Sequence, residues 1–230
     1  MIMGENPNEW KSQSVGADVF VEHVDPPCCS NAAGTKPTGV DRAVSAAQCG
    51  RKHLLRRQQR TRGFSDHHAA DILINSNLVS SVPQIQASIE KLGFHLSDVK
   101  ILLISHAHFD HCAGSAKLKE LTGAGYMVMD ADVPVVESGG KRDFQYGGSK
   151  GSWYPATKVD RVLHDGDQVR LGDTVLVAHL TPGHTKGTTT WTMKVSDGGK
   201  IREVVIVGSP NVNPGYKLVH NAAYPNIAQD

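Results

Sequence analysis

The sequence predicts a layered α+β domain, because it begins with alternating strands and helices and continues with antiparallel strands. The alternation runs from residue 71 to residue 129, and the antiparallel part extends to residue 207. Such an order of elements favours a layered α/β or α+β domain. The 230 residues leave room for one ordinary domain with a core, or for two small ones.

The first elements have clear sequence limits. Asp71–Asn75 predicts a short buried strand, and the helically spaced apolar residues of Val82–Leu92 predict a helix that Gly93 ends. Val99–Ile104 is a continuous apolar run between polar residues. Such a run predicts a strand that is covered on both faces.

Further elements follow in the same order. A second helix is expected over Ala113–Thr122, ended by Gly123, and a strand over Tyr126–Met129. The turn residues of Ser196–Gly199 indicate a hairpin between the last two strands. These later strands are expected over Thr174–Leu180, Thr188–Val195 and Arg202–Val207.

Composition excludes several classes of protein. The 24 Lys and Arg balance 23 Asp and Glu, so no overall field attracts nucleic acid or a membrane surface. No apolar run reaches the roughly 18–20 residues of a membrane span, and no signal peptide is visible. The four cysteines lack C-x-x-C spacing, so they predict neither a disulfide framework nor a zinc ribbon. The unusual count is the 12 histidines.

A group of potential metal ligands directly follows the Val99–Ile104 strand. The pattern is H-x-H-x-D-H, formed by His106, His108, Asp110 and His111. On an extended backbone, the side chains of His106 and His108, two residues apart, point in the same direction. Asp110 and His111 follow a bend in the chain, so their side chains can face a second, adjacent metal position. Imidazole and carboxylate ligands suit Zn²⁺, with iron and manganese as lesser possibilities. The alternative is a surface or core histidine cluster without a metal.

His184 offers a third imidazole. It lies in a Pro-Gly turn directly after the predicted Thr174–Leu180 strand, so it can also project from a strand end. A lone histidine in such a turn is more often structural than a ligand. Beside a two-histidine site that lacks a third ligand, coordination is the favoured interpretation.

Together these residues resemble the metallo-β-lactamase superfamily, in which H-x-H-x-D-H is followed by a Gly-His turn. Four further segments resemble the third subclass of metallo-β-lactamases, so the resemblance covers about residues 70–230. It implies a four-layer αβ/βα sandwich with the metals at one edge, here incomplete at both ends. The segments are Leu92–Phe94 together with Ser97–Lys100, then Glu137–Gly140, Thr181–Thr192 and Gly208–Leu218.

The resemblance implies a role for each matching residue. His106, His108 and His184 would hold a first zinc, and Asp110 and His111 a second. A hydroxide, oriented by Asp110, would attack the carbonyl of a small-molecule β-lactam, which confers antibiotic resistance, and the parent enzyme would be periplasmic. Ser209 and Asn211 stand where this subclass contacts the substrate carboxylate, and Cys112 would be a packing residue. The oligomeric state stays open.

The chain departs from the family at its end. The second zinc site of the family takes a third histidine from a later segment, and this sequence ends at Asp230 before that segment. His220 is the only late histidine, and its family counterpart is not a ligand. The resemblance therefore implies that a second zinc binds weakly, if at all, in a C-terminally truncated domain over residues 71–230.

Residues 1–70 depart further, with a strongly basic run over Arg51–Arg62. The run could be an anion-binding patch, a solvated face or the product of a displaced reading frame. At this place the family has the segments Gly-Asn-Ile-Tyr-Tyr-Val-Gly and Leu-Ile-Thr-Thr-Pro. If codons for the first segment are read one nucleotide out of frame, they encode Arg51–Arg57. Codons for the second segment, displaced in the same way, encode Ser65–Ala69. We therefore interpret residues 1–70 as an atypical segment, out of frame or disordered.

Two other functions stay open. The same ligand motif serves hydrolases of thioesters, lactones and phosphoesters, and the motif alone cannot separate them from a β-lactamase. The incomplete second site also leaves a non-catalytic metal-binding protein as an alternative.

Overall fold

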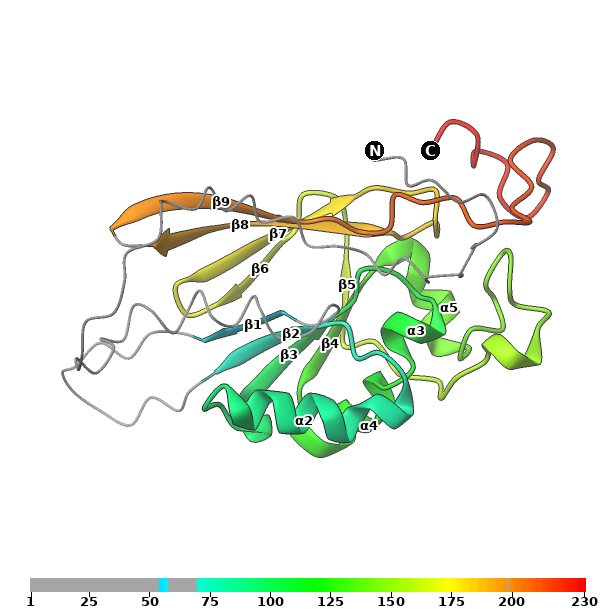
Figure 1. Cartoon of the computed structure of the whole chain (residues 1–230). Coiled ribbons are helices and arrows are strands. Elements are labelled where there is room, and N and C mark those ends of the chain that lie inside the picture. Colours follow the sequence, from blue (N-terminus) through cyan, green and yellow to red (C-terminus); the bar gives the residue numbers. More distant parts are fainter. Residues whose placement is uncertain (1–53, 58–69, 198) are drawn as a thin grey trace, which may run out of the picture.

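The computed structural model describes residues 54–57, 70–197 and 199–230. Two β-sheets lie one upon the other, and helices α2 (Val82–Lys91) and α4 (Ser115–Thr122) cover the outer face of the first sheet (Figure 1). The described residues thus form three layers of the expected four-layer sandwich. None of their helices is long and apolar enough to cross a membrane.

The first sheet has five strands in the order β1-β2-β3-β4-β5. β1 pairs antiparallel with β2, and the other neighbours are parallel, so β3 and β4 end at the same edge of the sheet. The strands are β1 (Leu54–Arg57), β2 (Asp71–Ile74), β3 (Val99–Leu103), β4 (Gly125–Met129) and β5 (Arg161–Leu163).

The second sheet is antiparallel throughout, in the order β6-β7-β8-β9. Asp197 pairs with Lys200, which confirms the hairpin predicted between the last two strands. The strands are β6 (Gln168–Leu171), β7 (Thr174–Leu180), β8 (Thr189–Asp197) and β9 (Lys200–Ile206).

Strand β3 shows why its sequence is a continuous apolar run. Leu102 packs with the residues beneath α2 and α4, whereas Ile101 and Leu103 pack between the two sheets. Trp191 of β8 fills the same inter-sheet core and is 1% exposed. The strand is therefore buried on both faces, as predicted.

The helix expected over Ala113–Thr122 is α4, which begins two residues later, at Ser115. A separate short helix, α3 (Phe109–Cys112), ends before the expected range, and Gly114 lies between the two. The Gly114 amide donates to the carbonyl of Asn77, at 2.8 Å, instead of to a helical carbonyl. Gly123, with φ of 67°, ends α4 as predicted.

The remaining elements are short. α5 (Val133–Glu137) was not predicted, and it follows a 3-10 turn over Asp130–Asp132 at the end of β4. Other 3-10 turns cover Val79–Ser81, Leu96–Asp98 and Lys150–Ser152.

Within residues 1–70, Leu54–Arg57 forms strand β1. The rest of the predicted atypical segment, apart from Ala70, lies outside the described residues, and so do Cys28, Cys29 and Cys49. The displaced reading frame therefore stays a hypothesis.

Candidate metal centre

The candidate site lies where loops from the two sheets meet. The loop after β3 carries His106 and His108, and the loop after β7 carries His184. The amide of Thr189, where β8 begins, donates to the carbonyl of Ser105 at 2.7 Å. This bond ties the edge of one sheet to the edge of the other beside the histidines.

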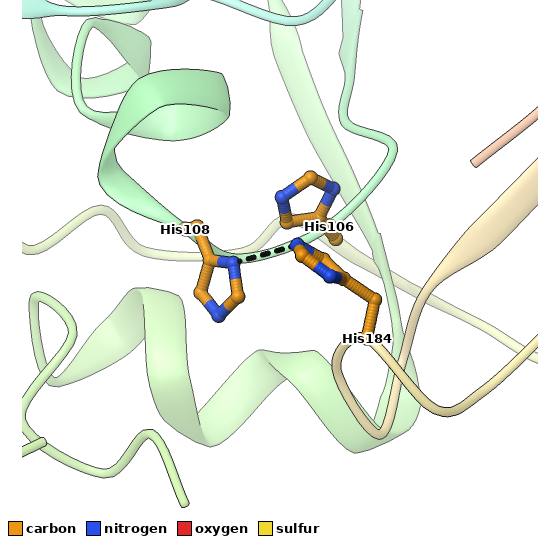
Figure 2. Close-up of side chains that lie close together, drawn as sticks. All are labelled: His106, His108 and His184. Atoms are coloured by element: carbon orange, nitrogen blue, oxygen red, sulfur yellow. Dashed lines mark hydrogen bonds between the residues drawn. The ribbon is translucent and has the colours of Figure 1, made fainter. Parts of the chain in front are cut away.

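His106, His108 and His184 form the first group of potential metal ligands. One ligand atom from each lies within 4.8 Å of the others, and all three side chains are buried. Figure 2 shows the three rings gathered together, with Nδ1 of His108 3.1 Å from Nε2 of His184. The structure therefore brings together the three histidines that the sequence predicted as a site.

The surroundings of His184 fix which nitrogen can bind a metal. Nδ1 donates to the backbone carbonyl of Asn211 at 2.8 Å, and a carbonyl can only accept. The proton is therefore on Nδ1, which leaves the lone pair of Nε2 facing His108. Burial and the neighbouring His108 lower the pKa of His184, which favours the neutral, ligating form.

A buried carboxylate faces the other side of the His108 ring. Its Nε2 lies 3.5 Å from Oδ2 of Asp143, while Nδ1 faces His184. Burial alone would raise the pKa of Asp143, but His108 and the backbone amides of Gln145 and Tyr146 hold it below its usual value. A carboxylate behind a histidine is the usual support of an imidazole ligand.

A second group consists of His106, Asp110 and His111, again with ligand atoms within 4.8 Å of one another. Oδ2 of Asp110 lies 3.7 Å from Nε2 of His111, and the Asp110 side chain is 40% exposed. His106 belongs to both groups. The structure thus offers two adjacent groups of potential ligands, and the one ligand atom of His106 can serve only one ion at a time.

The remaining residues named in the sequence analysis lie at different distances from the two ligand groups. The Ser209 hydroxyl lies 3.2 Å from Nδ1 of His106, whereas the Asn211 amide donates to the side chain of Asn213. Cys112 is buried in the core, where its thiol donates to the His108 carbonyl, as expected of a packing residue. His220 is exposed and lies outside both ligand groups of the described residues.

Sequence reasoning missed two buried carboxylates, those of Asp132 and Asp143. Asp132 accepts hydrogen bonds from both ligand-bearing loops, and burial raises its pKa to about 6. Its place directly after β4, the parallel neighbour of β3, could have placed it at the site edge. Asp143 lies in a long loop, where nothing local indicates its contact with His108.

The chain is similar to known proteins in sequence and in fold. The sequence profile of the Metallo-beta-lactamase superfamily matches residues 69–198. The native FEZ-1 metallo-beta-lactamase from Legionella gormanii is 62% identical with a TM-score of 0.69, and the match covers 70% of this chain and 61% of that one. For BJP-1, a subclass B3 metallo-beta-lactamase of Bradyrhizobium japonicum, the identity is 36% and the TM-score 0.65, over 76% of this chain and 62% of that one.

The chain is also similar to a hydrolase that is not named as a β-lactamase. A hydroxyacylglutathione hydrolase of Methylobacterium sp. (strain 4-46) is 31% identical over 103 residues, which are 45% of this chain and 32% of the relative. The chain therefore spans less than two thirds of each of these proteins.

Proposed function

This chain belongs to the metallo-beta-lactamase superfamily, and we propose that it is a zinc-dependent hydrolase that cleaves the amide bond of β-lactams. The observation that carries the proposal is the buried group of His106, His108 and His184. It lies in a chain whose sequence is 62% identical to that of a β-lactamase, in a match that covers 70% of the chain. Subclass B3 enzymes recur among the similar structures, which supports a small-molecule β-lactam as the substrate.

The donor set suits zinc. Three neutral imidazoles with a vacant fourth position are a usual catalytic zinc site. His184 already has the tautomer that such a site needs, and Asp143 supports His108 from behind. A bound Zn²⁺ lowers the pKa of a coordinated water to about 7 and polarises a substrate carbonyl.

The chain's own residues would then orient and protonate the reactants. We propose that Asp110 orients the attacking water and accepts its proton, and its partly exposed position beside His111 supports this role. In this proposal the same carboxylic acid returns a proton to the amide nitrogen as the ring opens. Ser209 and Asn211 are the proposed contacts of the substrate carboxylate.

Asp110 and His111 are the proposed ligands of a second zinc, which is expected to bind more weakly. The Asp110 carboxylate is partly exposed, and His106, the third member of this group, is already a proposed ligand of the first zinc. We also propose that the parent enzyme works in the periplasm and confers resistance to β-lactams. Fractionation of cells that express the gene from its natural start would test the location.

One observation favours a second candidate. The likeness to a hydroxyacylglutathione hydrolase supports thioester hydrolysis at the same site. Nitrocefin and S-lactoylglutathione, given to the Zn²⁺-loaded chain, separate the two activities, and His108→Ala controls for contaminating enzymes. Nitrocefin turnover that His108→Ala abolishes supports the β-lactamase. Thioester turnover alone would contradict it, and bound zinc without turnover would favour a metal-binding protein.

A further inference from the structure

Asp132 is a buried carboxylate that joins the two loops that carry the histidines. Its side chain is 1% exposed. Oδ2 accepts the amide of Ala107 at 2.9 Å and the hydroxyl of Thr185 at 2.8 Å. Oδ1 accepts the amide of Gly187 at 2.9 Å. One side chain therefore satisfies three donors that belong to two loops far apart in the sequence.

On the first loop, Asp132 acts on the residue between two proposed ligands. Ala107 separates His106 from His108, and its amide donates to Asp132. The carbonyl of Ala107 accepts the hydroxyl of Tyr154 at 2.7 Å. Because the backbone of Ala107 is held from both sides, the directions in which the two histidines leave the backbone are fixed.

On the second loop, Asp132 contacts the residue that follows His184 and packs against the turn beyond it. The Thr185 hydroxyl lies 2.9 Å from that of Thr188, so the loop is also bonded to itself. A Cβ on Gly187 would lie 2.6 Å from Cγ of Asp132, so no other residue fits there without a shift. The loop can therefore rest directly on the carboxylate.

We propose that Asp132 is a positioning residue, which sets the spacing between His106 and His108 on one loop and His184 on the other for a single metal ion. The inference rests on the proposed metal site, but it concerns residues that touch neither metal nor substrate. A carboxylate is suited to this task because it accepts from all three donors, whereas an amide would place an N–H group against at least one of them.

The burial of this group supports the assignment. A buried carboxylate is costly unless it is hydrogen-bonded, and here burial raises its pKa to about 6 in spite of its three donors. An apolar residue in this place would leave the amides of Ala107 and Gly187 and the Thr185 hydroxyl without this acceptor. The alternative is a purely structural anchor, which would stabilise the fold without changing how well the folded protein binds metal.

Metal affinity separates the two roles. Zn²⁺ dissociation constants are measured by competition with a chromophoric chelator, on protein whose folded fraction is checked by circular dichroism. Thr185→Val removes one hydroxyl at nearly constant size, and Asp132→Asn removes acceptor capacity. Both variants are expected to bind Zn²⁺ about 10- to 100-fold more weakly, as for other groups that orient ligands. Both should also alter the visible spectrum of bound Co²⁺, which reports coordination geometry.

Two matched variants complete the test. Thr185→Ser keeps the hydroxyl and is expected to restore affinity to near that of the wild type. Thr157→Val removes another buried threonine hydroxyl, which donates to Pro155 and not to Asp132. It is expected to lower stability but leave the Zn²⁺ affinity unchanged.

Several results would overturn the proposal. If Thr185→Val binds Zn²⁺ as tightly as the wild type and gives the same Co²⁺ spectrum, Asp132 is only a structural anchor. This variant decides the question even if Asp132→Asn does not fold. Equal losses in Thr185→Val and Thr157→Val would also contradict the assignment. A wild-type chain that binds no Zn²⁺ would refute the proposed function itself and this inference with it.

Discussion

His106 lies in both ligand groups, but it offers one ligand atom, which can serve only one ion. We expect that ion to be the one held with His108 and His184, so His106→Ala should act like His108→Ala. Asp110→Ala instead takes a donor from the second site. The three substitutions therefore test which ion His106 serves.

The magnitude follows from the number of ligands. Structural zinc sites with four protein ligands bind with about 10–16 kcal/mol, or about 3–4 kcal/mol per ligand. Loss of one ligand should then weaken binding by about 100- to 1,000-fold at each group that loses it. His108→Ala should keep residual binding at the second group, and Asp110→Ala should keep the tight binding of the first.

The assay is a Zn²⁺ titration against a chelator of known affinity, combined with metal content by mass spectrometry. Circular dichroism shows that each variant is folded. We expect His106→Ala to lose the tight binding and to keep the weak binding, as His108→Ala does. If it keeps the tight binding, or loses the weak binding while His108→Ala keeps it, the reasoning is refuted.

Three further predictions concern stability. The folded pKa of Asp132, about 6, lies above its usual value of 3.8, so the folded protein binds more protons and its free energy of unfolding should fall as pH rises from about 4 to about 6. Urea unfolding of the metal-free protein at several pH values checks this, and an Asp132 contribution of the opposite sign would contradict it. Gly187→Ala should lower stability by about 1–3 kcal/mol, because its new Cβ meets Asp132, whereas Gly148→Ala, with open space around it, should not. Trp191→Ala should cost about 3–5 kcal/mol by leaving a cavity between the sheets, and the partly exposed Trp153 should cost much less when replaced by alanine, as thermal melts can show.

The sequence predicts best those parts of the fold that local patterns determine. The apolar run of β3 and the turn residues between β8 and β9 carry their structure in a few adjacent residues. In contrast, β5 has only three residues and exists because it pairs with β4. Gly114 lies between α3 and α4 and donates to Asn77, so the late start of α4 depends on a partner 37 positions earlier. Such partners leave no pattern in the local sequence.

The candidate site divides in the same way. His106, His108, Asp110 and His111 are recognisable because they are close in sequence and directly follow a buried strand. His184 lies further along the chain, but its Pro-Gly turn marks it. The supports of these residues are less visible, since Asp132 and Asp143 act through contacts that form only when the two sheets come together.

The bond between Thr189 and Ser105 places the histidines across a seam between two halves of the molecule. An ion held by His106 and His184 would cross-link these halves without any covalent bond. At a free zinc concentration 1,000 times the dissociation constant, binding would add about 4 kcal/mol to the free energy of unfolding. Zinc supply would then govern how long the polypeptide survives proteases, as well as whether it can turn over an antibiotic.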